Sequence, residues 1–207
     1  MRSCIHQTLA TACALVCMLG SAASLADGRR HTHDGFFLRM CTGFGFGYSG
    51  VEDGAGNDDT IRGGSHASNF AIGAMVSRNL AIHADIFHVL MIEPESYVNG
   101  KSVGTAPGRY IAGGLGAGIT YYFMPSNLFL SASLDFVALR ADFGILNLEV
   151  ETDTGIGVDF LIGKEWWVSA NWGIGVAGQF VYSLVPSQWD TTHHSFGAAV
   201  LFTATYN

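Results

Sequence analysis

A period-two alternation of apolar residues, interleaved with glycine, recurs along this chain and constrains its fold more than any other feature. In residues 110–123, YIAGGLGAGITYYF, one face carries mainly apolar side chains and the other carries small or polar ones. A glycine-rich phosphate loop would need a helix after it, but Ile119–Phe123 is a β-branched and aromatic run that favours strand. The stretch therefore predicts a β-strand whose glycines Gly114, Gly116 and Gly118 share one face.

The composition narrows the class of protein. Only 13% of the residues are charged and the mean hydropathy is +0.29, which is too apolar for a typical soluble domain. After residue 26, however, no unbroken apolar run reaches the roughly 20 residues that a membrane-spanning helix needs. High hydrophobicity spread over alternating positions, together with 27 glycines, predicts a transmembrane β-barrel.

The N-terminus has the pattern of a secretory signal peptide. Arg2 precedes the apolar stretch Leu9–Leu19, and the segment that ends at Ala26 fits the small-x-small cleavage site. We therefore expect residues 1–26 to be removed, residues 27–35 to form a short periplasmic leader and residues 36–207 to form the barrel. A lipoprotein signal is the alternative, but Cys13 has too little apolar sequence before it, and Cys17 follows a valine that suits lipidation poorly.

The mature chain is not expected to form an intrachain disulfide or to bind nucleic acid. Cleavage after Ala26 leaves Cys41 as its single cysteine, so no intrachain disulfide can form. It also leaves nine Lys and Arg residues against seventeen Asp and Glu residues, a net charge of −8, and no basic cluster. This balance argues against nucleic acid as a partner.

Eight alternating segments follow the leader, and each is long enough for a tilted membrane strand. They are Phe36–Tyr48, Ser68–Ser77, Leu80–Ile92, Arg109–Phe123, Leu128–Ala141, Thr154–Gly163, Asn171–Leu184 and Thr192–Tyr206. The connections alternate between long and short, and the long ones are Ser49–Ala67, Glu93–Gly108, Asp142–Asp153 and Val185–Thr191. Outer-membrane barrels have short periplasmic turns and longer external loops. The order predicts an all-β, eight-stranded antiparallel up-and-down transmembrane β-barrel with periplasmic N- and C-termini.

Aromatic residues gather at the end of the predicted barrel that has the short turns. A periplasmic aromatic girdle is predicted from Phe36, Tyr121, Phe123, Trp166, Trp167, Trp172 and Tyr206. Amphipathic rings settle at the headgroup level of a membrane, which explains why they share one depth. A soluble lipocalin-like barrel would also alternate, but it would turn its apolar face inward and would not gather aromatics at one end.

The last residues, SFGAAVLFTATYN, alternate and end in an aromatic followed by Asn207. Together with residues 36–206, this segment resembles the small eight-stranded outer-membrane barrels, the OmpA-transmembrane-domain and OmpW-like proteins; the extra Asn207 departs from the usual terminal aromatic. The resemblance implies insertion by the barrel assembly machinery and contact with outer-membrane lipids and lipopolysaccharide. It implies location in the outer membrane of a Gram-negative bacterium, and it leaves the function and the oligomeric state open.

Several polar side chains fall on the inward face of the predicted strands. They are Arg39, His83, Asp85, Asp135, Asp159 and Gln179. Buried charges must be paired or hydrated, so we expect a polar network around Arg39 and the three aspartates that plugs the lumen. Its role is either structural or that of a gate or proton-linked pore.

Other polar clusters are weaker signals. The acidic first loop, with Asp58 and Asp59, could attract Ca²⁺ or Mg²⁺, but its spacing does not fit a calcium loop and a solvated face explains it. The tract that ends at His33 could bind a soft metal, although a disordered leader explains it as well. His193 and Ser195 form an H-x-S pair like that of the lipid A deacylases, but no carboxylate is assigned to orient the histidine.

These observations predict a non-enzymatic outer-membrane barrel with no cofactor, no metal and no catalytic residue, in a structural or surface-interaction role with acidic external loops. The alternative is a small low-conductance channel for ions or small apolar molecules. A lipid-modifying outer-membrane hydrolase is the third and least supported class.

Overall fold

The computed structural model describes residues 33–52, 58–143, 148–186 and 191–207, and the predicted signal peptide lies outside these ranges. The described residues form β-strands and turns, and no helix among them is long and apolar enough to cross a membrane. The strands are β1 (Phe36–Glu52), β2 (Asp58–Ser77), β3 (Leu80–Ile92), β4 (Glu95–Val98), β5 (Lys101–Thr105), β6 (Arg109–Phe123), β7 (Leu128–Phe143), β8 (Leu148–Glu151), β9 (Gly155–Trp167), β10 (Trp172–Pro186) and β11 (Thr192–Tyr206).

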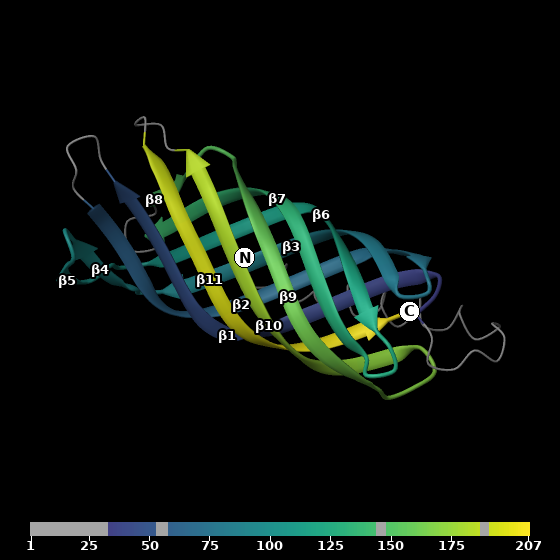
Figure 1. Cartoon of the computed structure of the whole chain (residues 1–207). Coiled ribbons are helices and arrows are strands. Elements are labelled where there is room, and N and C mark those ends of the chain that lie inside the picture. Colours follow the sequence, from purple (N-terminus) through teal and green to yellow (C-terminus); the bar gives the residue numbers. More distant parts are fainter. Residues whose placement is uncertain (1–32, 53–57, 144–147, 187–190) are drawn as a thin grey trace, which may run out of the picture. The chain divides into compact units, whose positions relative to one another are not determined.

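Eight of these strands close into an antiparallel barrel (Figure 1). They follow one another around the wall in the order β1, β2, β3, β6, β7, β9, β10 and β11, and β11 pairs back to β1. The predicted eight-stranded antiparallel barrel is thus confirmed. Closure leaves no free sheet edge along the wall, as a β-structure inside a membrane requires.

The stagger of the strands fixes the width of the barrel. Paired residues followed once around the wall from Phe37 return to β1 at Gly47, ten residues further along. Eight strands with this stagger tilt by about 40° and enclose a space that side chains can fill. The lumen is therefore a packed interior wherever inward side chains are large enough to meet.

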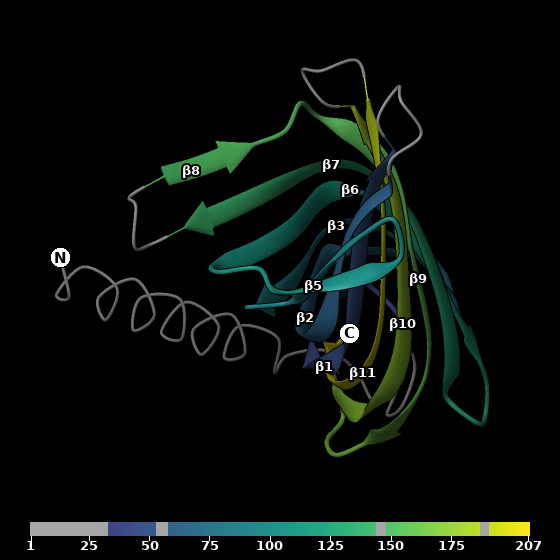
Figure 2. The ribbon, with the colours of Figure 1, turned by 90° about the vertical axis from the view of Figure 1, so that its left-hand side faces the viewer.

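The barrel has two different ends. At the turn end, short turns join β2 to β3, β6 to β7 and β9 to β10, and β11 ends beside the start of β1, where Leu38 pairs with Tyr206. At the loop end, β4 and β5 form a hairpin that pairs with β2, and β8 pairs with β7 (Figure 2). Both chain ends of the barrel lie at the turn end.

The first long loop was predicted wrongly. Residues 49–67 were expected to be a loop, but β1 and β2 stay paired as far as Glu52 and Asp58. Strands can continue beyond a membrane because each backbone N–H and C=O still finds its partner on the neighbouring strand. Side chains outside the lipid need not alternate between apolar and polar, so the hydrophobic pattern ended before the strands did.

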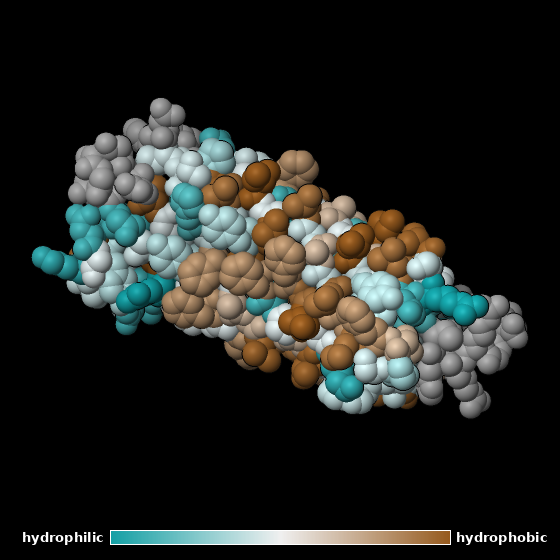
Figure 3. All heavy atoms as spheres, in the orientation of Figure 1, coloured by the Kyte–Doolittle hydropathy of each residue, from teal (hydrophilic) through white to brown (hydrophobic). Residues whose placement is uncertain are grey.

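The outer surface is apolar across the middle of the barrel (Figure 3). The most exposed of its large side chains are Phe44 at 76%, Leu134 at 73%, Phe136 at 70% and Val200 at 70%. A water-soluble protein rarely exposes a continuous apolar band of this kind. The apolar face thus points outward, opposite to the soluble lipocalin-like alternative, and toward lipid.

The glycines of β6 sit where the wall leaves no room for a side chain. A Cβ at Gly116 would collide with the carbonyl oxygen of Leu134 on β7, and one at Gly114 would collide with the Phe87 ring. On the outward face of the same strand, a Cβ at Gly113 would find its nearest heavy atom 3.9 Å away. The inward glycines of β6 therefore allow the neighbouring backbone and the side chains that fill the lumen to pack closely against this strand. This requirement explains why the strand contains them.

Candidate functional site

All six predicted lumen residues lie inside the barrel. Their exposed fractions range from 0% to 4%, so none contacts bulk solvent freely. They come from five strands: Arg39 from β1, His83 and Asp85 from β3, Asp135 from β7, Asp159 from β9 and Gln179 from β10. The structure brings most of them together in two layers rather than in one network.

The first layer joins two of the aspartates through amides. Asn69 Nδ2 donates to Asp159 Oδ2 at 2.8 Å and to Asp85 Oδ2 at 3.3 Å, and Gln179 Nε2 donates to both oxygens of Asp159 at 2.9–3.0 Å. Neither carboxylate oxygen of Asp135 has a hydrogen-bond partner among the described residues. Asn69 was not predicted, although its odd position on β2 places it on the same inward face as Ala71.

Arg39 occupies a second layer, closer to the turn end. Its guanidinium donates to Thr120 Oγ1 at 3.1 Å and to Ser131 Oγ at 2.9 Å, and it lies 5.1 Å from the ring centroid of Phe129. His83 Nε2 also lies 3.0 Å from Thr120 Oγ1.

The residues of the predicted polar network around Arg39 and the three aspartates are divided between these two layers. No ion pair within 4.0 Å joins Arg39 to an aspartate in the described part of the chain. The long arginine side chain reaches the hydroxyls of β6 and β7, whereas the amides of Asn69 and Gln179 serve the aspartates. Both layers cross the lumen from wall to wall and so obstruct it.

A third obstruction closes the turn end and includes His33, the first residue that the structure describes. His33 is 2% exposed, and its ring stacks on Tyr122 with 3.6 Å between centroids. Its Nε2 lies 2.7 Å from Asn127 Oδ1, and its Nδ1 lies 2.8 Å from the side-chain amide of Asn207, so both ring nitrogens have hydrogen-bond partners. Asn207, which departs from the usual terminal aromatic, thus has a structural role in holding His33.

Near the turn end, a buried carboxylate is held by the last strand. Glu165 is 1% exposed and accepts hydrogen bonds from Thr203 Oγ1 at 2.9 Å and Thr205 Oγ1 at 2.6 Å. The sequence reasoning missed this group, although Glu165 has the same odd parity on β9 as Asp159. With the His33 cluster, it fills the lumen at the turn end.

Six of the seven predicted girdle residues lie on the outer surface near the turn end. Phe36, Tyr121, Phe123 and Trp166 are 42–52% exposed there, and Trp172 and Tyr206 pack edge to face. Trp167 does not belong to this ring, because successive residues of a strand point to opposite sides. Its ring lies 4.9 Å from that of His33, in the mouth of the barrel.

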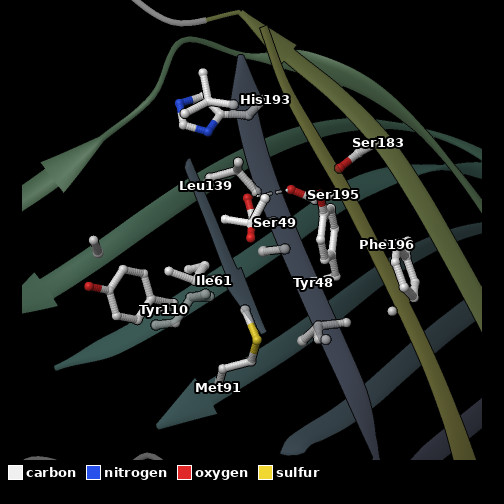
Figure 4. A pocket seen from close by; sticks show the side chains of 18 of the residues that line it. Tyr48, Ser49, Ile61, Met91, Tyr110, Leu139, Ser183, His193, Ser195 and Phe196 are labelled. Carbon is white, nitrogen blue, oxygen red and sulfur yellow. Dashed lines mark hydrogen bonds between the residues drawn. The ribbon is translucent and has the colours of Figure 1, made fainter. Parts of the chain in front are cut away.

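Above the aspartate layer, the lumen opens at the loop end into a cavity of about 390 Å³ (Figure 4). Its walls include Met91, Leu139 and Val181, together with the hydroxyls of Ser49, Ser183 and Ser195. Phe87 and Val137 are 1% and 0% exposed and belong to the apolar packing of the barrel interior. The loop end thus presents a mainly apolar cavity above an obstructed lumen.

The H-x-S pair lies in this cavity without the geometry of a catalytic pair. Ser195 Oγ donates to Ser49 Oγ at 2.9 Å, and no hydrogen bond joins it to His193 in the described structure (Figure 4). A hydrolase nucleophile needs a base within hydrogen-bond reach and a group that orients the base. Ser195 is instead part of the cavity wall, where it is hydrogen-bonded to Ser49.

The contacts of His33 are expected to stabilise the folded barrel. We expect His33→Ala to lower the free energy of unfolding by about 2 kcal/mol, because the substitution removes a stacked ring and two buried hydrogen bonds. Urea unfolding of the refolded barrel, followed by its heat-dependent gel mobility, measures this. His194→Ala, at an exposed position of β11, is the matched control and should have little effect; equal loss in both variants would contradict a role for His33 in the seal.

A closed eight-stranded barrel with an apolar outer face and polar ends is a β-barrel of the bacterial outer membrane. Neisserial surface protein A (NspA) is a similar solved structure: it is 14% identical, the match covers 83% of this chain and 97% of that chain, and the TM-score is 0.53. This likeness establishes the fold of the small eight-stranded outer-membrane barrels.

Two further similar structures have lower scores. Ail of Yersinia pestis is 10% identical, with 82% of this chain and 99% of that chain covered and a TM-score of 0.42. The outer membrane protein AlkL is 11% identical, with 87% and 93% covered and a TM-score of 0.45. No family model and no curated protein matches the chain.

Proposed function

We propose that this protein is a non-enzymatic, ion-tight barrel of the outer membrane that acts at the cell surface through its loop end. The obstructed lumen carries the proposal. Between the loop-end cavity and the turn end, the Asn69–Asp159 layer, the Arg39 layer and the His33 cluster follow one another. Their residues are almost fully buried, which leaves little room for a hydrated ion to pass.

In this role the turn end and both termini of the barrel lie in the periplasm. The loop end then extends from the cell, carrying the continuation of β1 and β2, the β4–β5 hairpin and β8. Exposed charged residues lie on these elements, among them Asp58, Asp59, Glu95 and Lys101. A polar projection of this kind suits contact with the medium, with lipopolysaccharide or with another surface. The barrel assembly machinery would insert the protein into the outer membrane.

Planar bilayer recording tests the ion-tight lumen. The refolded mature protein should show no discrete conductance steps, while a porin inserted in the same bilayer serves as the positive control. A boiled-versus-unboiled gel shift must first show that the sample is folded. Reproducible ohmic steps from the folded protein would contradict the proposal and support the channel alternative.

One observation favours a second function, the passage of small apolar molecules. The loop-end cavity is lined mainly by apolar side chains, so a small apolar molecule that enters it would contact an apolar wall. Uptake by whole cells that express the protein, compared with cells that lack it, separates passage from binding. Faster uptake of an apolar tracer would support passage, and equal uptake would favour the ion-tight surface role.

A further inference from the structure

We propose that the loop-end cavity is a binding site for one small uncharged amphiphile, a molecule with an apolar body and a single hydroxyl, ether or ester group. The site deepens the proposed surface role by giving the loop end a ligand. It does not depend on whether the lumen conducts, because it requires only the cavity and its lining. Four features of the cavity carry the inference: its size, its apolar wall, its serine group and the position of its charges.

The size and wall suit the apolar body. A volume of about 390 Å³ lies in the range of small-molecule sites. Met91 from β3, Ala112 from β6, Leu139 from β7 and Val181 from β10 supply apolar surface from four separate strands. Water in such a space finds few hydrogen-bond partners, so an apolar ligand would displace it favourably.

The serine group supplies a polar anchor. Ser195 Oγ donates to Ser49 Oγ at 2.9 Å, and the O–H of Ser49 has no acceptor among the described residues. Ser183, which pairs with Ser195 across β10 and β11, is 1% exposed on the same wall. A ligand oxygen beside Ser49 could accept its O–H, and this directs the polar group of the ligand to that side of the cavity.

The position of the charges favours an uncharged ligand. Three charged residues border the cavity, namely Asp59, Arg140 and Glu151, and all three are exposed. Inside the cavity, the lining consists of apolar side chains, the hydroxyl-bearing side chains of serines, threonines and tyrosines, and one half-buried histidine, His193. A carboxylate or an ammonium group carried to this depth would lose its hydration without gaining an opposite charge.

Methionine methyl resonances provide a direct test. The mature chain has four methionines, and only Met91 lines the cavity; Met40 and Met124 are on the outer surface or at the turn end. The folded protein, labelled with [¹³C-methyl]methionine in lipid nanodiscs, would be titrated with 1-octanol, n-octane and octanoate. We expect a saturable shift of the Met91 methyl with 1-octanol, at least about fivefold weaker binding of the other two compounds, and only a shared, non-saturating drift at Met40 and Met124.

Two pairs of variants assign the site. Ala112→Phe should fill the cavity and abolish the saturable shift, whereas Ala117→Phe, on the outward face of the same strand, should leave it intact. Ser49→Ala should reduce the affinity for 1-octanol to that for n-octane. A gel shift shows that each variant folds, and Leu139→Trp takes the place of Ala112→Phe if that variant does not.

Distinct results would overturn this inference and the proposed function. A Met91 methyl that moves no more than those of Met40 and Met124, or an unchanged titration of a folded cavity-filling variant, rules out the site. Octanoate binding as tight as that of 1-octanol overturns the uncharged ligand. Conductance steps in a protein that shows the Met91 titration would refute the ion-tight lumen and leave the binding site standing.

Discussion

Gly116→Ala is expected to prevent most of the protein from refolding into a closed barrel. The added Cβ would collide with the carbonyl oxygen of Leu134 and would also lie 2.7 Å from the Cα of Asp135, both on the paired strand β7. A backbone cannot move aside as a flexible side chain can, so β6 and β7 would have to separate where the register is fixed on both sides. We expect a loss of more than about 3 kcal/mol in the free energy of unfolding.

The same strand offers the control. Gly113→Ala makes the same chemical change three residues away, where the nearest heavy atom is 3.9 Å from the new Cβ. The fraction of folded protein, measured by the gel shift after refolding into lipid, should stay close to wild type for Gly113→Ala and fall sharply for Gly116→Ala. Equal refolding yields and equal urea midpoints would show that the wall has more room at Gly116 than the structure indicates.

Arg39→Ala is expected to lower the free energy of unfolding by about 3 kcal/mol. The guanidinium is fully buried, donates to two hydroxyls and lies over the rings of Phe37 and Phe129. Its removal loses hydrogen bonds from a charged group and leaves a cavity the size of a long side chain between β1 and β6–β7. The urea midpoint of the refolded barrel measures the effect.

Arg78→Ala is the matched control for this prediction, because Arg78 is exposed in the turn between β2 and β3. Substitution there should change the free energy of unfolding by less than about 0.5 kcal/mol. An Arg39→Ala midpoint that coincides with that of Arg78→Ala would mean that the Arg39 layer does not stabilise the barrel. The polar residues of this layer would then need a role other than stabilising the barrel.

Strand positions were largely predictable from the sequence. The bounds predicted for β3, β6 and β11 agree residue for residue with the structure, because apolar alternation continues to the turn residues at both ends. The prediction failed at β2, which begins ten residues before its expected start at Ser68. Outside the lipid, backbone pairing alone maintains the strand, and no hydrophobic pattern marks it.

The residues of the lumen were predicted less completely. Parity identified six inward polar groups, and the structure buries all of them. The sequence-based prediction omitted Asn69 and Glu165, which have the same parity, and it assigned Trp167 to the girdle although parity turns that side chain inward. His33 lies outside any strand, so no periodic pattern could show that its side chain enters the mouth of the barrel.

The sequence by itself determined the number of barrel strands, their up-and-down order and the side of the wall on which most residues lie, but not the additional strands β4, β5 and β8 of the loop end. These features depend on local patterns: alternation with period two and the lengths of the connections. Only the tertiary structure decided which side chains meet across the lumen, since Arg39 contacts Thr120 and Ser131 rather than an aspartate. The physical reason is the stagger of ten residues around the wall. It sets which residues of distant strands share one height in the barrel, and no local segment contains that information.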